Sequence, residues 1–402
     1  MKFFWPNQSK NWKETIESII TAKPLSPFHP EVLSFLQSIS KAILKDHSYR
    51  RYPELVALAY WLRKAHLSEM QESYVKKAGE RMVLARGTAL HFAPSNVDTI
   101  FVYSWVLSML AGNSNILRIS GRKQEQTELL LRAIINGLED YPEVASRTAI
   151  LTYEHNNETT QYLSERCHIR VIWGGDETVK AIRSIPLAPL ATELAFPDRF
   201  SLSVLEAGAV LNADDHEFNG LIKNFYNDGF WFAQMACSSP RLIVWTGEEK
   251  SIESAQDRFW TQLNSYLDEH LEEYSPALQV QKLTTGYSLS DKESVVNFLH
   301  LPNFSRLKVN NIDLDIRERH CGGGLFVELD LPQLYDLIPF LDDKDQTLSY
   351  FGFTKSQLME FAEGVGNRSI DRIVPIGQAL DFEGIWDGYD LLMHFTREIV
   401  IR

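Results

Sequence analysis

Cys237 lies in a segment of mostly small residues, Gln234-Met235-Ala236-Cys237-Ser238-Ser239-Pro240. A cysteine thiolate is a strong nucleophile that can form a thioester with an acyl group. The small neighbours leave room for such a group, and Pro240 favours a turn before the next strand. A buried structural cysteine fits the same pattern, because free cysteines are often buried. On spacing alone the two interpretations are equally supported.

Asn96 is a candidate for stabilising negative charge in the same chemistry. It lies in Pro94-Ser95-Asn96, between a strand-like run and a helix-like run. A side-chain amide can donate a hydrogen bond to a developing oxyanion, and the backbone N–H of Cys237 could donate a second. The local alternative is a helix cap, a position that serine and asparagine commonly occupy.

Glu193, in Thr192-Glu193-Leu194-Ala195-Phe196, is a candidate general base. A carboxylate near Cys237 could accept a proton from the thiol or from water. A surface or ion-paired glutamate is the common alternative. A second thiol, Cys321, precedes three glycines, and we interpret that segment as a structural turn.

Two further segments could hold a phosphorylated cofactor. Arg118 ends a strand-like run, and Arg122 follows it across Ser120-Gly121. Arginine suits phosphate because its donors form a planar fork. A solvated helix start is the alternative, and we include Ser95 and Ser120 as possible cofactor contacts.

The other segment is Gly174-Gly175-Asp176, between a strand-like and a helix-like run. Glycines permit close approach of the backbone to a phosphate, and a helix N-terminus favours an anion. The full GxGxxG pattern is absent, so an ordinary strand–helix turn explains the segment equally well.

These candidates need a framework, and short apolar runs alternating with amphipathic stretches supply it. Such alternation predicts parallel βαβ units, and nucleotides bind at the carboxyl ends of their strands. We therefore expect an α/β fold with two such regions: a nucleotide-binding one, here called the cofactor domain, and one with Cys237, here called the catalytic domain. The runs are 82–92, 116–119, 148–151, 169–173 and 200–205, followed later by 242–245, 325–329, 348–351 and 370–374.

We expect four regions along the chain. Residues 1–80 read as a helical region that packs on the cofactor domain, because apolar residues recur at helical spacing between prolines. Residues 81–205 form the cofactor domain, 206–375 the catalytic domain with Cys237, and 376–402 a segment that returns to the cofactor domain. The run 398–401 would add an oligomerisation strand, across a subunit interface.

Composition excludes several classes of function. The 402-residue chain has a formal net charge of -13, which argues against nucleic-acid binding. Its 3 cysteines form no disulfide framework and fit a reducing compartment.

No signal pattern or run long enough to span a bilayer is evident, so we expect a cytoplasmic protein. There is no G-x-S-x-G elbow, P-loop, H-E-x-x-H helix or spaced zinc framework, and we expect no metal.

Several segments, in this order, resemble the LuxC-type long-chain acyl-CoA reductases of bacterial bioluminescence, within the aldehyde dehydrogenase superfamily. The resemblance covers roughly residues 45–402. The matching segments are 91–97, 103–105, 111–116, 171–177, 197–201, 236–240, 372–377 and 385–390.

The resemblance implies an aldehyde-dehydrogenase-like fold with a Rossmann-like cofactor domain and an α/β catalytic domain. It also implies NADPH as cofactor and a long-chain acyl-CoA or acyl-protein thioester as substrate. It also suggests an acyl-protein synthetase as partner and a homodimer or homotetramer. By motif position, Cys237 matches the acylated nucleophile and Asn96 the oxyanion-hole amide. Arg118 occupies the place of a cofactor-binding lysine, and Glu193 falls near the general base.

The sequence departs from the oxidative members of the superfamily in two places. Their Glu-Leu-Gly-Gly-Lys run is Glu193-Leu194-Ala195-Phe196-Pro197 here, and their later Glu-x-Phe-Gly-Pro motif is not evident near Cys321. We therefore expect reduction of an acyl thioester to an aldehyde through acyl-Cys237. Three alternatives stay open: an oxidative aldehyde dehydrogenase, an acyl carrier or scaffold without redox chemistry, and a Cys–His thioesterase.

Overall fold

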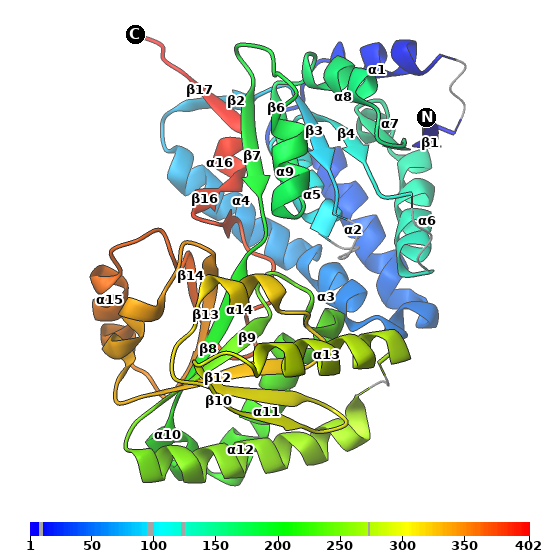
Figure 1. The fold of residues 1–402 in the computed structure, drawn as a ribbon. Helices are drawn as coiled ribbons and strands as arrows, with labels where there is room; N and C mark the ends of the chain where they lie inside the picture. Colours follow the sequence, from blue (N-terminus) through cyan, green and yellow to red (C-terminus); the bar gives the residue numbers. More distant parts are fainter. Residues whose placement is uncertain (8–10, 95–99, 122–124, 272–273) are drawn as a thin grey trace. The chain divides into compact units, whose positions relative to one another are not determined.

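The computed structural model describes residues 1–7, 11–94, 100–121, 125–271 and 274–402 (Figure 1). The chain divides into two compact units, the first comprising Met1–Asp198 with Phe382–Arg402 and the second Arg199–Asp381. None of the helices in the described ranges has the length and apolar character needed to cross a membrane.

The first unit is built on a six-stranded sheet in the order β1-β5-β4-β3-β6-β7. Its strands are β1 (Lys2–Trp5), β3 (Thr88–Phe92), β4 (Ser114–Arg118), β5 (Thr148–Thr152), β6 (Ile169–Trp173) and β7 (Thr192–Phe196). All neighbours are parallel except β1, which runs antiparallel to β5. The chain moves from β3 through β4 to β5, then returns to the other side of β3 with β6. The order of the strands therefore reverses at β3.

Helices cover both faces of this sheet, which is why β3 is buried along its whole length. Leu90 and Phe92 belong to the apolar core under α1, α8 and α9, whereas His91 bonds to Ser104 of α5. The helices of the unit are α1 (Trp12–Ile20), α2 (Pro30–Lys45), η1 (His47–Arg51), α3 (Pro53–Trp61), α4 (Lys64–Ala78), α5 (Ile100–Leu110), α6 (Glu125–Asp140), α7 (Pro142–Ala145), α8 (Asn157–Ser164), α9 (Asp176–Arg183) and α16 (Leu391–His394).

Two small antiparallel pairs complete the first unit: β2 (Met82–Ala85) with β17 (Thr396–Ile399), and β15 (Ile385–Trp386) with β16 (Tyr389–Asp390). The apolar run 82–92, expected as one strand, is two strands separated at Gly87, where φ is +135°. The C-terminal strand, expected across a subunit interface, pairs with β2 of the same chain.

The second unit is built on a seven-stranded sheet in the order β10-β11-β12-β9-β8-β13-β14, parallel except for β10. Its strands are β8 (Phe200–Glu206), β9 (Pro240–Thr246), β10 (Val295–His300), β11 (Ser305–Val309), β12 (Leu325–Leu331), β13 (Asp345–Phe351) and β14 (Arg372–Pro375). The strand β8 belongs to this sheet, whereas the division expected from the sequence assigned residues up to 205 to the cofactor domain.

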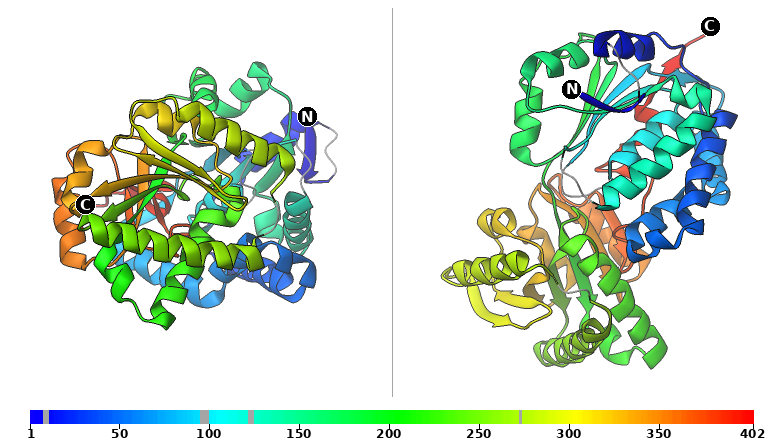
Figure 2. Two further views of the ribbon diagram at one scale, coloured as in Figure 1. Left: turned by 60° about the horizontal axis from the view of Figure 1, so that its bottom comes forward. Right: turned by 90° about the vertical axis from the view of Figure 1, so that its right-hand side faces the viewer.

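Two apolar cores lie on opposite faces of this sheet. Helices α10, α11 and α12 pack on one face, and α13, α14, η3 and α15 pack on the other (Figures 1 and 2). The helices are α10 (Ala207–Asn212), α11 (Asp215–Phe230), η2 (Trp231–Gln234), α12 (Glu249–His270), α13 (Pro276–Leu289), α14 (Leu314–Arg319), η3 (Leu334–Phe340) and α15 (Lys355–Gly364).

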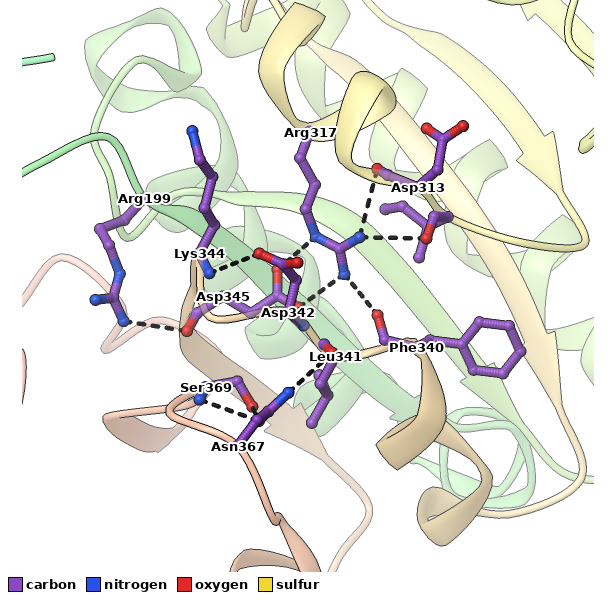
Figure 3. A network of polar contacts seen from close by, with 11 residues as sticks. Arg199, Asp313, Arg317, Phe340, Leu341, Asp342, Lys344, Asp345, Asn367 and Ser369 are labelled. Carbon is purple, nitrogen blue, oxygen red and sulfur yellow. Dashed lines mark hydrogen bonds and ion pairs between the residues drawn. The ribbon is translucent and has the colours of Figure 1, made fainter. Parts of the chain in front are cut away.

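A buried ion pair anchors the amino end of β13. The Arg317 guanidinium donates to both carboxylate oxygens of Asp345, at 2.9 and 2.8 Å, and to the carbonyl of Phe340 at 2.6 Å. Figure 3 shows this network, which Arg199 joins through the Asp345 carbonyl at 3.2 Å. Because Arg317 lies in α14 and Arg199 directly precedes β8, the network links both segments to the amino end of β13.

Candidate active site

Cys237 lies between η2 and β9, at the amino edge of the second unit's sheet. It is half-buried, whereas Cys167 and Cys321 are buried. Burial raises the pKa of Cys167 to about 12 and also raises the pKa of Cys321. Since the thiolate is the nucleophile, the geometry favours Cys237 as the reactive thiol of this chain.

The amino ends of neighbouring strands hold the backbone of Cys237. The Ser201 hydroxyl on β8 donates to the Cys237 carbonyl at 2.7 Å and accepts from the backbone N–H of Thr347 on β13 at 3.2 Å. Ser201 is fully buried. A hydroxyl that both donates and accepts in this way links the cysteine to two strands at once.

The chain reaches Cys237 through a left-handed segment. The backbone φ values of Phe232, Ala233 and Gln234 are 55°, 51° and 63°. Residues other than glycine rarely adopt this left-handed conformation. The carboxamide of Gln234 is fully buried and bonds to Pro240 and Leu325. No local sequence pattern indicates these hydrogen bonds of Gln234, because Leu325 is distant in the sequence.

The glycines after Cys321 pack against this segment. The Gly323 N–H donates to the Ala233 carbonyl at 2.8 Å, and Gly322 has φ +70°. A Cβ on Gly322 would lie 2.9 Å from the Ala233 carbonyl oxygen, a backbone atom, so this close approach favours glycine. The Cys321 thiol is buried beside it, in accord with a structural turn.

The carboxylate of Glu193 takes part in two ion pairs within the first unit. It lies 2.5 Å from the Arg170 guanidinium and 2.8 Å from that of Arg183. Arg170 is its cross-strand partner between β6 and β7. This environment suits a structural carboxylate, and the role of Glu193 as a base stays a prediction.

The candidate cofactor residues of the first unit gather at the carboxyl edge of its sheet. Arg118 ends β4, Ser120 follows it, and Gly174 and Gly175 follow β6. Arg118 donates to the Tyr153 carbonyl at 3.3 Å and lies over the Tyr153 ring. These loops flank the point at which the strand order reverses, where open α/β sheets receive dinucleotides.

A carboxylate already lies at the N-terminus of α9. Asp198 accepts from the Asp176 N–H at 3.4 Å, and its own N–H donates to the Asp176 carboxylate at 3.2 Å. A Cβ on Gly175 would lie 3.0 Å from the Asp198 carboxylate. The helix dipole is therefore partly neutralised by the protein itself. Ser95, Asn96 and Arg122 lie outside the described residues.

Residues 67–398 match the family model "Acyl-CoA reductase (LuxC)". The chain is a member of this family. As a member of the LuxC family, the chain is an oxidoreductase that acts on acyl or aldehyde groups. The match also confirms the resemblance inferred from the sequence. A search among curated proteins finds no significant match.

Solved structures show that the fold of this LuxC-family chain is that of aldehyde dehydrogenases. Aldehyde dehydrogenase 21 from Physcomitrella patens superposes with a TM-score of 0.70 at 11% identity, covering 97% of this chain and 90% of that one. Lactaldehyde dehydrogenase from Escherichia coli gives 0.66 at 13%, covering 98% and 92%. The NADP-complexed glyceraldehyde-3-phosphate dehydrogenase GapN from Methanocaldococcus jannaschii gives 0.65 at 13%, covering 97% and 93%. The expected α/β, aldehyde-dehydrogenase-like fold is confirmed.

Proposed function

We propose that this LuxC-family chain reduces a long-chain fatty acyl thioester to a fatty aldehyde, with NADPH as reductant and Cys237 as the acyl carrier. The observation that carries the proposal is the half-buried Cys237 on a turn fixed by Ser201, in a chain whose other thiols are buried. A thiol that reacts with a bulky acyl group must be accessible and held in one orientation.

The acylation step requires only the chain's own groups. The Cys237 thiolate attacks the thioester carbonyl, a new carbon–sulfur bond forms, and the bond to the carrier thiol breaks. The carrier leaves as a thiolate and the acyl group stays on Cys237. Asn96 and the Cys237 N–H are proposed to donate to the oxyanion, and loss of one such donor should raise the barrier by about 3 kcal/mol.

The carboxyl edge of the first unit's sheet fits a dinucleotide, because the strand order reverses at β3. There, Arg118 and Ser120 are proposed to hold the ribose or its 2′-phosphate. Gly174, Gly175 and Asp176 lie at the same edge, and Ser95 and Arg122 are proposed to contact the cofactor as well. Since Asp198 sits against the start of α9, we assign phosphate binding to Arg118 rather than to that helix. Bound NADPH supplies the hydride for the acyl carbon.

Reduction of the acyl group ends with release of the aldehyde and return of the thiolate to Cys237. This direction needs no water molecule at the thioester, so it gives Glu193 no obligatory proton transfer. The two arginine partners of Glu193 support the same view. A base role for Glu193 would belong to the oxidative direction.

Family membership supports three further proposals. The substrate is an acyl-CoA or an acyl-protein thioester, and an acyl-protein synthetase delivers the acyl group in the second case. The chain works as a homodimer or homotetramer. It works in the cytoplasm, where a nucleophilic thiol stays reduced.

The test combines intact mass with absorbance of the nicotinamide. Wild type, Cys237→Ala and Cys321→Ala are incubated with tetradecanoyl-CoA, and NADPH is then added. We expect one acyl group on wild type and Cys321→Ala only, lost on addition of NADPH as aldehyde appears. Stable acylation without NADPH consumption would indicate a carrier, and release of acid without cofactor would indicate a thioesterase. Acylation of Cys237→Ala would overturn the assignment of the nucleophile.

A further inference from the structure

The turn that bears Cys237 is closed by a single side chain. Gln234 precedes Cys237 by as many residues as Pro240 follows it. The Gln234 Nε2 donates to the Pro240 carbonyl at 2.9 Å, so the carboxamide bridges the two ends of the turn. The cysteine sits at the middle of the ring that this hydrogen bond closes.

The same carboxamide ties the turn to β12. Nε2 also donates to the Leu325 carbonyl at 3.1 Å, and Oε1 accepts from the Gly324 N–H at 2.9 Å. Both hydrogens of the amide and its oxygen are thereby used, and the side chain is fully buried. A buried group with all its hydrogen bonds satisfied has one stable orientation.

The hydrogen bonds of Gln234 stabilise an unfavourable backbone conformation. The left-handed φ values at Phe232, Ala233 and Gln234 are unfavourable for residues with a Cβ. They persist only where surrounding contacts fix them, and the Gly323 N–H bond to Ala233 is one such contact. The Gln234 carboxamide supplies three more hydrogen bonds, to Pro240, Gly324 and Leu325.

We propose that Gln234 is a positioning residue for the reaction at Cys237: its carboxamide braces the turn so that the thiol meets an acyl thioester in one orientation. Gln234 touches neither substrate nor cofactor in this proposal and acts through the backbone of Cys237. The inference rests on the proposed function for its acylation readout. Its other readout, alkylation of Cys237 by iodoacetamide, does not depend on the substrate.

The test compares Gln234→Met, which keeps the length of the side chain but removes all three hydrogen bonds, with Gln256→Met as a matched control. Gln256 is a buried glutamine of α12 whose amide donates to Asp330 at 2.8 Å. Each variant is assayed for circular dichroism, for acylation by tetradecanoyl-CoA, and for Cys237 alkylation at several pH values, with the site located by peptide mass.

For folded Gln234→Met we expect acylation at saturating tetradecanoyl-CoA to slow at least about tenfold, with KM changed less than about threefold. Alkylation by the small reagent should be more than about twofold faster, because a loosened turn exposes the thiol. Gln256→Met should match wild type in both assays. Acylation and alkylation of Gln234→Met both within about twofold of wild type would overturn the positioning role.

Gln234→Glu keeps the test decisive if the methionine variant does not fold. A protonated carboxyl can donate one of the two lost hydrogen bonds, whereas a carboxylate donates none. The alkylation rate of this variant relative to wild type should therefore approach unity as the pH falls, and a ratio independent of pH would count against the proposal. If wild type itself is not acylated, the proposed function fails, but the alkylation comparison still tests the brace.

Discussion

Glu193 and Arg170 form a cross-strand ion pair between β7 and β6, with carboxylate and guanidinium 2.5 Å apart. Arg170 is 3% exposed, and its remaining donors reach Ser164 and the Ile185 carbonyl. Because its charge is buried, Arg170 depends on Glu193 for neutralisation.

We predict that Glu193→Gln lowers the free energy of unfolding by about 3 kcal/mol, because Arg170 is left buried with no countercharge. Urea denaturation measures this change. Glu177→Gln is the control, since Glu177 pairs with Lys180 on the exposed face of α9 and should cost less than about 0.5 kcal/mol. A folded Glu193→Gln protein of unchanged stability that no longer releases product would instead support the base role.

A second prediction concerns His91, which lies in a buried chain of hydrogen bonds. Trp173 Nε1 donates to the Ser104 hydroxyl at 3.2 Å, and Ser104 and the Asn115 side-chain oxygen lie 3.1 Å from the two ring nitrogens of His91. The Asn115 oxygen can only accept, so Nε2 of His91 carries the hydrogen and Nδ1 accepts from Ser104. Desolvation lowers the pKa of His91 to about 4.

The depressed pKa fixes the sign of the pH dependence. The unfolded chain binds a proton at His91 below its ordinary pKa of 6.5, while the folded protein does not until about 4. The stability contributed by neutral His91 is therefore present above pH 6.5 and lost as the pH falls towards 4. The loss should be about 3 kcal/mol.

The stability difference between wild type and His91→Asn should accordingly shrink by that amount between pH 7 and pH 4, in urea denaturation followed by tryptophan fluorescence. Taking the difference removes the contributions of other titrating groups. One of these is Asp228: burial raises its pKa to about 7, so its contribution to stability changes with pH in the opposite direction. The control is His155→Asn, which exchanges an exposed loop histidine of the same unit. A difference for His91→Asn that does not change with pH would contradict the prediction.

The Arg317–Asp345 pair of Figure 3 leads to a third prediction. Both side chains are almost fully buried, and the guanidinium contacts both carboxylate oxygens. Arg317→Met or Asp345→Asn alone should destabilise the second unit by about 3–5 kcal/mol, because each leaves an unpaired group. The double variant should lose less than the sum, since neither charge is then left behind.

Denaturation of the four proteins gives the coupling energy, and strict additivity would show that the pair contributes nothing. Arg319→Met is the control on the same helix. Arg319 pairs with Asp315 at 3.0 Å on the protein surface, and its loss should change the stability by less than about 0.5 kcal/mol.

The sequence predicts the framework well where patterns are local. Apolar run 169–173 is the strand β6, and runs of the same kind lead to the other buried parallel strands. The hairpin β10–β11 was not predicted, because its outer strand is largely exposed and lacks a continuous apolar run. The pairing of Glu193 with Arg170 needs the register of β6 and β7, which no local pattern contains.

In the candidate site, too, features that depend on residue type can be predicted from the sequence, whereas contacts between distant strands cannot. Residue type makes Cys237 a candidate nucleophile, and this role stays a prediction. The roles of Gln234 and Ser201 depend on strands distant in the sequence and could not be read from it. His91 and Trp173 belong to segments that carry the family resemblance, yet both are buried in the first unit's core. In these two segments, part of the resemblance therefore reflects the packing of the sheet.

The last prediction concerns Gly322, which has φ +70° and lies against the cysteine turn. A Cβ at this position would lie 2.7 Å from the Met235 sulfur and 2.9 Å from the Ala233 carbonyl. Met235 can move aside, but the Ala233 carbonyl is held by the Gly323 N–H. Gly322→Ala should therefore displace the turn and lower the free energy of unfolding by about 1–3 kcal/mol.

Denaturation and the rate of Cys237 acylation by tetradecanoyl-CoA test this together, and we expect acylation to slow about tenfold. Gly366→Ala is the control, because nothing lies within 4 Å of a Cβ there and its stability should stay within about 1 kcal/mol of wild type. Adding Met235→Ala to Gly322→Ala should recover only the part of the loss caused by the sulfur. Full recovery would show that the backbone contact with Ala233 is soft, and an unchanged Gly322→Ala protein would mean that the turn tolerates a side chain at this position.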